Sequence, residues 1–97
     1  MKVVINNCWG GFSLSNEALA MIGIKDAYPC NETFGLKEYG DEYRADERLI
    51  KAVETLGKNA NGSCAELKIV EVPNGIKFHI DDYDGYETII EDGHSWY

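Results

Sequence analysis

The sequence predicts an α+β fold: a small single domain over residues 1–97 in which an N-terminal strand and two helices pack on a mostly antiparallel sheet with a C-terminal β-meander. Three observations lead to this prediction. The chain opens with a β-branched apolar run, two later segments combine helix caps with apolar residues at helical spacing, and the last third alternates apolar and polar residues between turn signals. A chain of 97 residues has room for one hydrophobic core.

The first predicted strand covers residues 2–5, where three consecutive β-branched residues are typical of a strand covered on both faces. A turn containing Gly10-Gly11 follows it. Ser15 is placed as the N-cap of a helix over residues 16–22, and the glycine after this segment ends the helix.

Residues 24–45 show no sustained periodicity, so an irregular excursion is expected there, with at most a short strand or helical turn. Its aromatic residues either pack this loop onto the body of the protein or cover a ligand; they are Tyr28, Phe34, Tyr39 and Tyr43. The segment from Asp46 to Gly57 then carries the clearest helical pattern. Asp46 is its cap and Gly57 its end, and the apolar positions are Leu49, Ile50, Val53 and Leu56.

The C-terminal third predicts three strands, at residues 65–72, 76–80 and 86–90. Asn74-Gly75 is the expected hairpin turn between the first two, and Asp84-Gly85 is the turn between the last two. The inward-facing residues of the middle strand are expected to be Ile76, Phe78 and Ile80. Consecutive pairing of these strands would give a meander that the N-terminal strand can join.

The formal net charge of −8 is unevenly distributed: residues 81–97 carry six acidic side chains and no Lys or Arg. Such a surface repels phosphate backbones, so ordinary nucleic-acid binding is not expected. No apolar run reaches membrane-spanning length and no signal peptide is recognisable, so we expect neither membrane association nor secretion. Cys8, Cys30 and Cys64 are odd in number and contain no C-x-x-C pair, which favours neither a disulfide framework nor a zinc site and fits the cytoplasm.

The turn after the first strand is the main candidate site. A strand, a glycine pair and a helix N-terminus within a few residues would let backbone N–H groups and the hydroxyls of Ser13 and Ser15 face an anion such as a phosphate or carboxylate. The turn has neither P-loop nor dinucleotide-binding spacing, and it has no lysine to hold a triphosphate. The alternative is that the glycines meet a steric requirement of the turn alone.

Two further groups of residues could carry chemistry. Cys8 would act as a nucleophile only if His79 or His94 came close, with Asp81 to orient the ring; the alternative is a buried structural cysteine. The terminal aromatic residues around Trp96 either dock within or between subunits or stack on a planar ligand such as a nucleobase. We assign no catalytic residue, no metal ligand and no cofactor.

Two motifs together resemble a family of small tailed-phage and prophage proteins. They are V-I-N-N-C-W-G-G-F-S-L-S at residues 4–15 and A-N-G-S-C-A-E-L-K-I-V-E-V-P at residues 60–73, and Tyr83-Asp84-Gly85 and the His94/Trp96 tail add to the likeness. The resemblance spans about two thirds of the chain. Members often carry an arginine between the terminal His and Trp, where this chain has Ser95. The resemblance implies an accessory protein acting in the infected bacterial cell, a class that commonly counters host defence.

The leading functional expectation is a non-enzymatic, homo-oligomeric protein that sequesters a small anionic or nucleotide-like signal. The expected ligand-binding residues are Asn7, Cys8, Gly10, Gly11, Phe12, Ser13, Ser15, His94 and Trp96. The alternative is an inhibitor or decoy whose acidic segment, from Asp81 to Glu91, binds a basic surface of a host protein. A hydrolase that depends on Cys8 is the third hypothesis.

Overall fold

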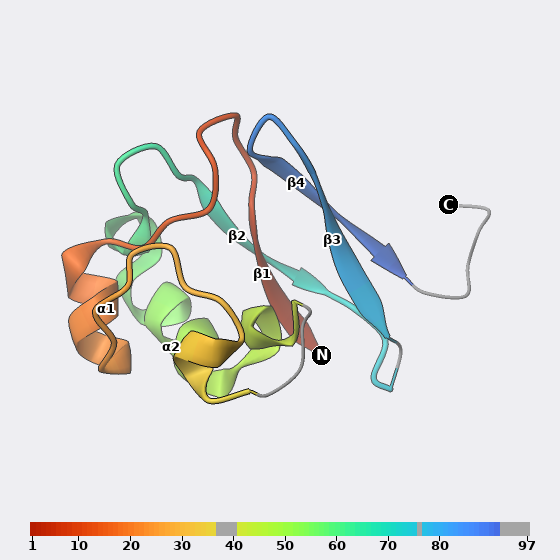
Figure 1. Cartoon of the computed structure of the whole chain (residues 1–97), viewed down its shortest axis with the longest axis horizontal. Helices are drawn as coiled ribbons and strands as arrows, with labels where there is room; N and C mark the ends of the chain where they lie inside the picture. The colour runs from red at the N-terminus through yellow and green to blue at the C-terminus, as the bar shows by residue number, and fades with distance from the viewer. Residues whose placement is uncertain (37–40, 76, 92–97) are drawn as a thin grey trace.

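The structure is a computed structural model that describes residues 1–36, 41–75 and 77–91. These residues form three layers (Figure 1). Two helices lie on one side of a two-stranded sheet, and a β-hairpin lies on the other side. The elements are, in order, β1 (Lys2–Asn6), α1 (Asn16–Ile22), η1 (Glu32–Phe34), η2 (Glu42–Ala45), α2 (Glu47–Leu56), η3 (Gly57–Ala60), β2 (Leu67–Glu71), β3 (Phe78–Tyr83) and β4 (Tyr86–Glu91). The predicted α+β class is confirmed.

Both helices begin and end at the predicted capping residues. The Ser15 hydroxyl accepts a hydrogen bond from the backbone N–H of Ala18 at the start of α1, and Gly23 ends α1 in the left-handed conformation. The Asp46 carboxylate accepts from the backbone N–H of Arg48 at the start of α2, and Gly57 follows its last residue. The apolar side of α2 contributes Leu49, Ile50 and Val53 to the core.

Strand β1 is covered on both faces, as its unbroken apolar run predicts. Val3 and Val4 are completely buried. Val4 belongs to the core on the helix side of the sheet, whereas Val3 and Ile5 belong to a second apolar cluster with residues of the hairpin; its hairpin members are Phe78, Ile80 and Ile89. Phe78 and Ile80 therefore point inward as expected, and Ile76 lies outside the described residues.

The pairing of the strands corrects one part of the prediction. Strand β2 pairs antiparallel with β1, and β3 pairs antiparallel with β4, so Asn74-Gly75 does not close a hairpin between β2 and β3. A backbone bond extends the ladder past the end of β2, because the N–H of Val72 donates to the carbonyl oxygen of Met1 over 2.8 Å. The N-terminal amine also donates to the side-chain Oδ1 of Asn74 over 2.7 Å. The β3–β4 hairpin stacks on the sheet instead of widening it, because apolar side chains on both faces of β1 and β2 need cover.

The middle excursion packs onto the helix side through two of its aromatic residues. Phe34 and Tyr43 are buried with stacked rings whose centroids are 5.7 Å apart, whereas Tyr28 is 70% exposed. Tyr39 lies outside the described residues. Within the described ranges, none of the helices has the length and apolar character needed to cross a membrane.

Candidate functional site

A buried amide, that of Asn6 at the end of β1, joins the segments that build the site. The Asn6 side chain is 0% exposed. Its Nδ2 donates to the carbonyl oxygens of Cys8 and Gly85, over 2.8 and 2.7 Å, and its Oδ1 accepts from the backbone N–H of Glu66 over 2.8 Å. One side chain therefore holds together the turn after β1, the start of β2 and the β3–β4 turn. Figure 1 shows the turn after β1 beside the β3–β4 turn.

Two glycines allow these turns to touch. A Cβ added to Gly10 would lie 1.7 Å from the carbonyl oxygen of Cys64, and one added to Gly85 would lie 2.7 Å from the carbonyl oxygen of Trp9. Gly11, by contrast, has open space around its Cβ position but a φ of +92°, which L-residues rarely adopt. Gly10 thus allows two backbone segments to approach closely, and Gly11 allows a left-handed turn. Both are steric roles, which the sequence suggested as the alternative to anion binding.

Three aromatic rings gather where these turns meet, and we call Trp9, Tyr83 and Tyr86 the aromatic cluster. The Trp9 ring lies edge-on to the Tyr83 ring at a centroid distance of 5.8 Å, and its centroid is 5.2 Å from that of Tyr86. Trp9 is nevertheless 60% exposed and Tyr83 is 70% exposed. Large exposed aromatic side chains held by neighbours are typical of binding surfaces.

Three exposed aspartates lie next to Tyr83 in the sequence, and we call Asp81, Asp82 and Asp84 the acidic rim. The cross-strand register places Asp81 opposite Thr88 and Tyr83 opposite Tyr86, so Asp81 and Tyr83 lie on the same face of the hairpin. Asp84 occupies the turn itself with a φ of +51°, and Oδ1 of Asp82 accepts from the N–H of Gly85 over 2.7 Å. The rim gives this end of the molecule a negative potential.

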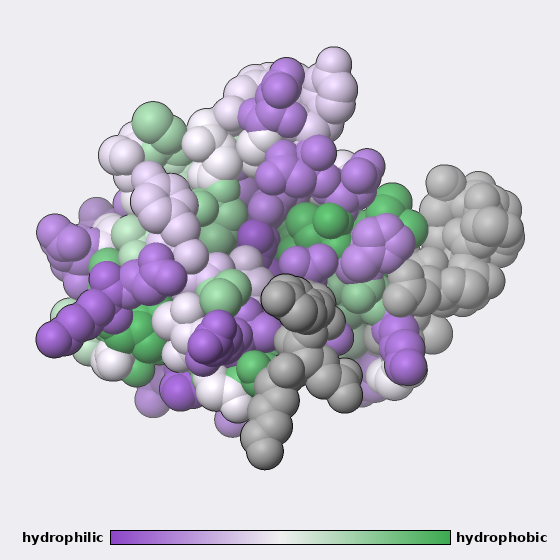
Figure 2. All heavy atoms as spheres, in the orientation of Figure 1, coloured by the Kyte–Doolittle hydropathy of each residue, from purple (hydrophilic) through white to green (hydrophobic). Residues whose placement is uncertain are grey.

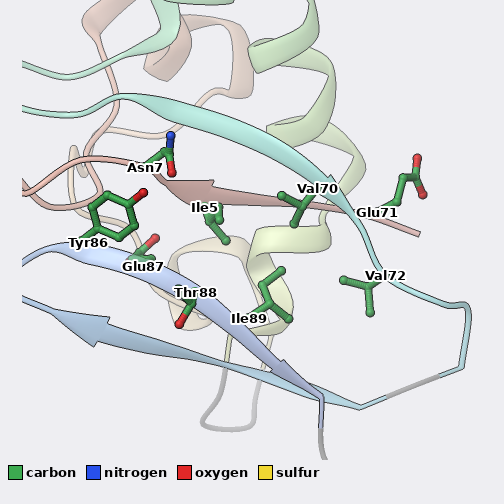
Figure 3. A pocket seen from close by; sticks show the side chains of 9 residues that line it. All are labelled: Ile5, Asn7, Val70, Glu71, Val72, Tyr86, Glu87, Thr88 and Ile89. Atoms are coloured by element: carbon green, nitrogen blue, oxygen red, sulfur yellow. The ribbon is translucent and has the colours of Figure 1, made fainter. Parts of the chain in front are cut away.

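An open groove of about 300 Å³ runs away from the cluster between the β1–β2 sheet and β4. Figure 3 shows Asn7 and Tyr86 at one end of it, with Val72 and Ile89 toward the other. Ile5 and Val70 line its floor. In the space-filling view of Figure 2, apolar atoms over the hairpin are bordered by polar side chains, so the apolar surface there is a small patch.

A buried ion pair fixes the hairpin behind this groove. Two nitrogens of the Arg44 guanidinium donate to the two carboxylate oxygens of Glu87 over 2.6 and 2.8 Å, and both side chains are more than nine-tenths buried. Burial is the largest influence on the pKa of Arg44 and lowers it, but the hydrogen bonds and electrostatic interactions with Glu87 and Tyr43 together outweigh burial, so the pKa lies above its ordinary value. Glu87 also accepts from the backbone N–H of Asn6 over 2.7 Å, and Arg44 donates to the carbonyl oxygen of Val4 over 3.3 Å.

Several residues expected to bind a ligand have contacts within the protein. The Phe12 ring is buried with the Arg44 guanidinium 3.6 Å above its centroid. Ser13 is buried against Gly62, and the Ser15 hydroxyl caps α1 and donates to the carbonyl oxygen of Asn59. Asn7 and the exposed Gly10 remain accessible beside Gly11, whereas His94 and Trp96 lie outside the described residues.

Cys8 lies under the same turn, and its thiol donates to the carbonyl oxygen of Cys64 over 3.0 Å. Gly85 contacts the backbone of Trp9 at the hairpin turn, while His79 lies near the opposite end of β3. The rise of a strand separates His79 from Tyr83 by roughly 13 Å along β3. The fold therefore does not bring His79 to Cys8. Among the described residues, no group of three or more His, Cys, Asp or Glu side chains is placed to hold a metal ion.

The aromatic cluster was not predicted from the sequence, although two of its three residues have a sequence signal. A two-residue turn places the flanking residues directly opposite each other, so Tyr83 and Tyr86 around Asp84-Gly85 form a predictable cross-strand pair. The position of Trp9 beside them depends on the docking of the hairpin through Asn6 and Glu87, for which the sequence contains no local signal.

Comparisons of the chain with protein-family models, with curated proteins and with solved structures found no match.

Proposed function

We propose that this chain is a non-enzymatic binding protein that recognises a positively charged segment of another protein through the aromatic cluster and the acidic rim. The observation that carries the proposal is the exposure of Trp9 and Tyr83, at 60% and 70%, on turns that the buried Asn6 holds in place. Aromatic side chains in a fixed position contribute contact area at little cost in conformational entropy.

The charge around the cluster selects the class of partner. The faces of tryptophan and tyrosine rings attract guanidinium and ammonium groups, and nearby carboxylates add to that attraction. The same carboxylates repel phosphate groups, which disfavours the small anionic ligand as first choice. The resemblance to phage proteins supports a host protein of the infected bacterium as the partner, and an inhibitor or decoy as the role.

A titration with a hexa-arginine peptide tests this proposal. Trp96→Phe leaves Trp9 as the only tryptophan, so the Trp9 emission should change as the peptide binds. We expect Trp9→Ala, followed by calorimetry, to weaken binding about fivefold to tenfold. The matched control is Tyr28→Ala, which removes another exposed ring and should leave the affinity unchanged.

A charge control separates the acidic rim from the overall net charge of −8. Asp81→Asn/Asp84→Asn should weaken peptide binding much more than Glu17→Gln/Glu32→Gln, which removes the same charge from exposed positions elsewhere. Equal losses in the two double variants, or full affinity in Trp9→Ala, would refute the proposed surface.

A planar small molecule stacked on the cluster is the second candidate, and the groove of about 300 Å³ beside Tyr86 and Asn7 favours it. Nucleotides and ADP-ribose-type compounds are the probes. A rise in melting temperature with one of them, lost in Trp9→Ala but kept in Tyr28→Ala, would support this candidate over the peptide-binding one. Trp9→Ala suits this test better than a substitution at Gly11, where a side chain would strain the backbone.

A further inference from the structure

Cys8 and Cys64 are far apart in sequence but adjacent in the structure. The Cys8 thiol lies 3.0 Å from the carbonyl oxygen of Cys64, across 56 positions of sequence. Backbone bond lengths then place Cys8 Sγ within about 5.4 Å of the Cα of Cys64. The Cβ of Cys64 also lies against Gly10, 2.5 Å from the position that a Cβ of Gly10 would take. The side chain of Cys64 thus starts beside the turn that carries the Cys8 thiol.

The surroundings of the two thiols allow them to approach. Cys64 is exposed and Cys8 is half-buried, and both are free thiols. The thiol of Cys8 has a second contact, 3.4 Å from Oδ1 of Asn6, and that oxygen keeps its bond from Glu66 if the sulfur moves away. Rotation about the Cα–Cβ bond of Cys64 with a small shift of its loop would bring the sulfurs together.

We propose that Cys8 and Cys64 form a reversible disulfide when a low-molecular-weight disulfide such as oxidised glutathione is present. The thiolate of one cysteine attacks the glutathione disulfide and releases one glutathione thiol. The second cysteine then attacks the mixed disulfide and releases another. The two protein thiols are oxidised together, and one glutathione disulfide is reduced to two thiols, which take up the two protons.

The consequence concerns the aromatic cluster, and this part rests on the proposed function. Trp9 follows Cys8 directly, so the disulfide would tie the segment that carries this ring to the loop before β2. Restricting that segment further reduces the ordering needed on binding. We therefore expect the oxidised protein to bind the arginine peptide at least threefold more tightly than the reduced protein.

The chemical step is tested on the isolated protein by intact mass measurement. Cys30→Ser removes the third thiol, so that two remain. Incubation with oxidised glutathione should then remove the mass of two hydrogen atoms, leave no glutathione adduct, and yield a monomer on a non-reducing gel. Reduction with dithiothreitol should restore both thiols. The disulfide should also raise the melting temperature by about 5–15 °C.

The controls are Cys8→Ser and Cys64→Ser in the same background, in which the two-hydrogen loss must disappear. Stable glutathione adducts on both cysteines of Cys30→Ser, or disulfide-linked dimers, would overturn the proposed bond. If the bond forms but the affinity for the arginine peptide is the same in both redox states, the proposed regulation is wrong and the binding function stands. If neither redox state binds the peptide, the binding function is wrong and the disulfide stands.

Discussion

At the scale of single residues, the site depends on the buried side-chain amide of Asn6, which forms hydrogen bonds with three chain segments. Asn6 is also next to the carboxylate of Glu87, which accepts from its backbone N–H. An aspartate has the same shape, but it offers no donor to the carbonyl oxygens of Cys8 and Gly85 and adds a second negative charge. The chemistry of position 6, and not only its volume, therefore sets the geometry of the turns.

We predict that Asn6→Asp lowers the free energy of unfolding by about 3 kcal/mol or more, because two buried acceptors lose their donors and like charges meet. Urea unfolding measures this loss. The neighbouring half-buried position provides the control, since Asn7→Asp should cost about 0.5 kcal/mol or less. Similar midpoints for the two variants would contradict the role of the Asn6 amide.

The two adjacent glycines should respond differently to substitution. In Gly11→Ala the new methyl group meets open space, and the cost is the left-handed backbone, about 1–2 kcal/mol. In Gly10→Ala it meets the backbone of Cys64, so the loop before β2 must move. We predict that Gly10→Ala changes the amide NMR signals of residues 62–66 and the Trp9 emission, whereas Gly11→Ala leaves the signals of residues 62–66 in place. Unperturbed signals of residues 62–66 in Gly10→Ala would contradict the contact.

At the scale of elements, the helices were predictable and the sheet pairing was not. Caps and apolar spacing are local, so Ser15, Asp46 and the glycines that end each helix located α1 and α2 from the sequence. Pairing is a choice among distant segments. The Asn74-Gly75 turn signal was overridden because the β3–β4 hairpin covers an apolar face of the β1–β2 sheet instead of pairing with the edge of β2, and the cluster at Trp9 depends on that arrangement. The sequence therefore singled out the turn that carries Trp9, but not the packing of Tyr83 and Tyr86 beside it.

The N-cap of α2 gives a pH-dependent prediction. The hydrogen bond from the Arg48 side chain, over 2.9 Å, holds the pKa of the Asp46 carboxyl below its ordinary value. A lowered pKa in the folded state stabilises the fold above the unfolded value of about 3.9, and this stabilisation is lost as the pH falls through the folded-state pKa.

We predict that Asp46→Asn, which keeps an N-cap but loses the charge, lowers stability by about 1 kcal/mol or less at pH 6, because the pair is partly exposed. The difference from the unsubstituted protein should vanish toward pH 2. Chemical unfolding between these pH values measures it, and Glu47→Gln in the same turn is the control. A difference that grows toward low pH would show that the sign is wrong.

At the scale of the whole molecule, two apolar clusters lie on opposite faces of one thin sheet. The helices cover one face of the sheet, and the β3–β4 hairpin covers the other. The Arg44–Glu87 pair links them, because Arg44 comes from η2 and Glu87 from β4. The hairpin, and with it Tyr83 and Tyr86, is held to the rest of the protein by that pair, by Asn6 and by the second cluster.

We predict that Glu87→Gln lowers the free energy of unfolding by about 3 kcal/mol, because Arg44 keeps a buried charge without its counter-ion. Hydrogen exchange should accelerate more in β3 and β4 than in α2, since the hairpin loses its attachment first. Glu54→Gln breaks the exposed 2.7 Å pair with Lys2 and should change the free energy of unfolding far less than Glu87→Gln does. Uniform acceleration of exchange across all elements would argue against a separately opening hairpin.

The Arg44–Glu87 pair also decides what the outer side of β1 can do. The backbone N–H of Asn7 donates to Glu66, and the backbone N–H of Val72 donates to Met1. The backbone N–H and C=O groups of odd-numbered residues along β1 therefore point toward β2, and those of even-numbered residues point away from it. On that side the carbonyl of Val4 and the N–H of Asn6 already bond to Arg44 and Glu87, which act in place of a neighbouring strand. A β-strand from another copy cannot pair there, so this buried ion pair occupies a sheet border that would otherwise have unpaired backbone groups, and its loss would open a route to edge-to-edge association.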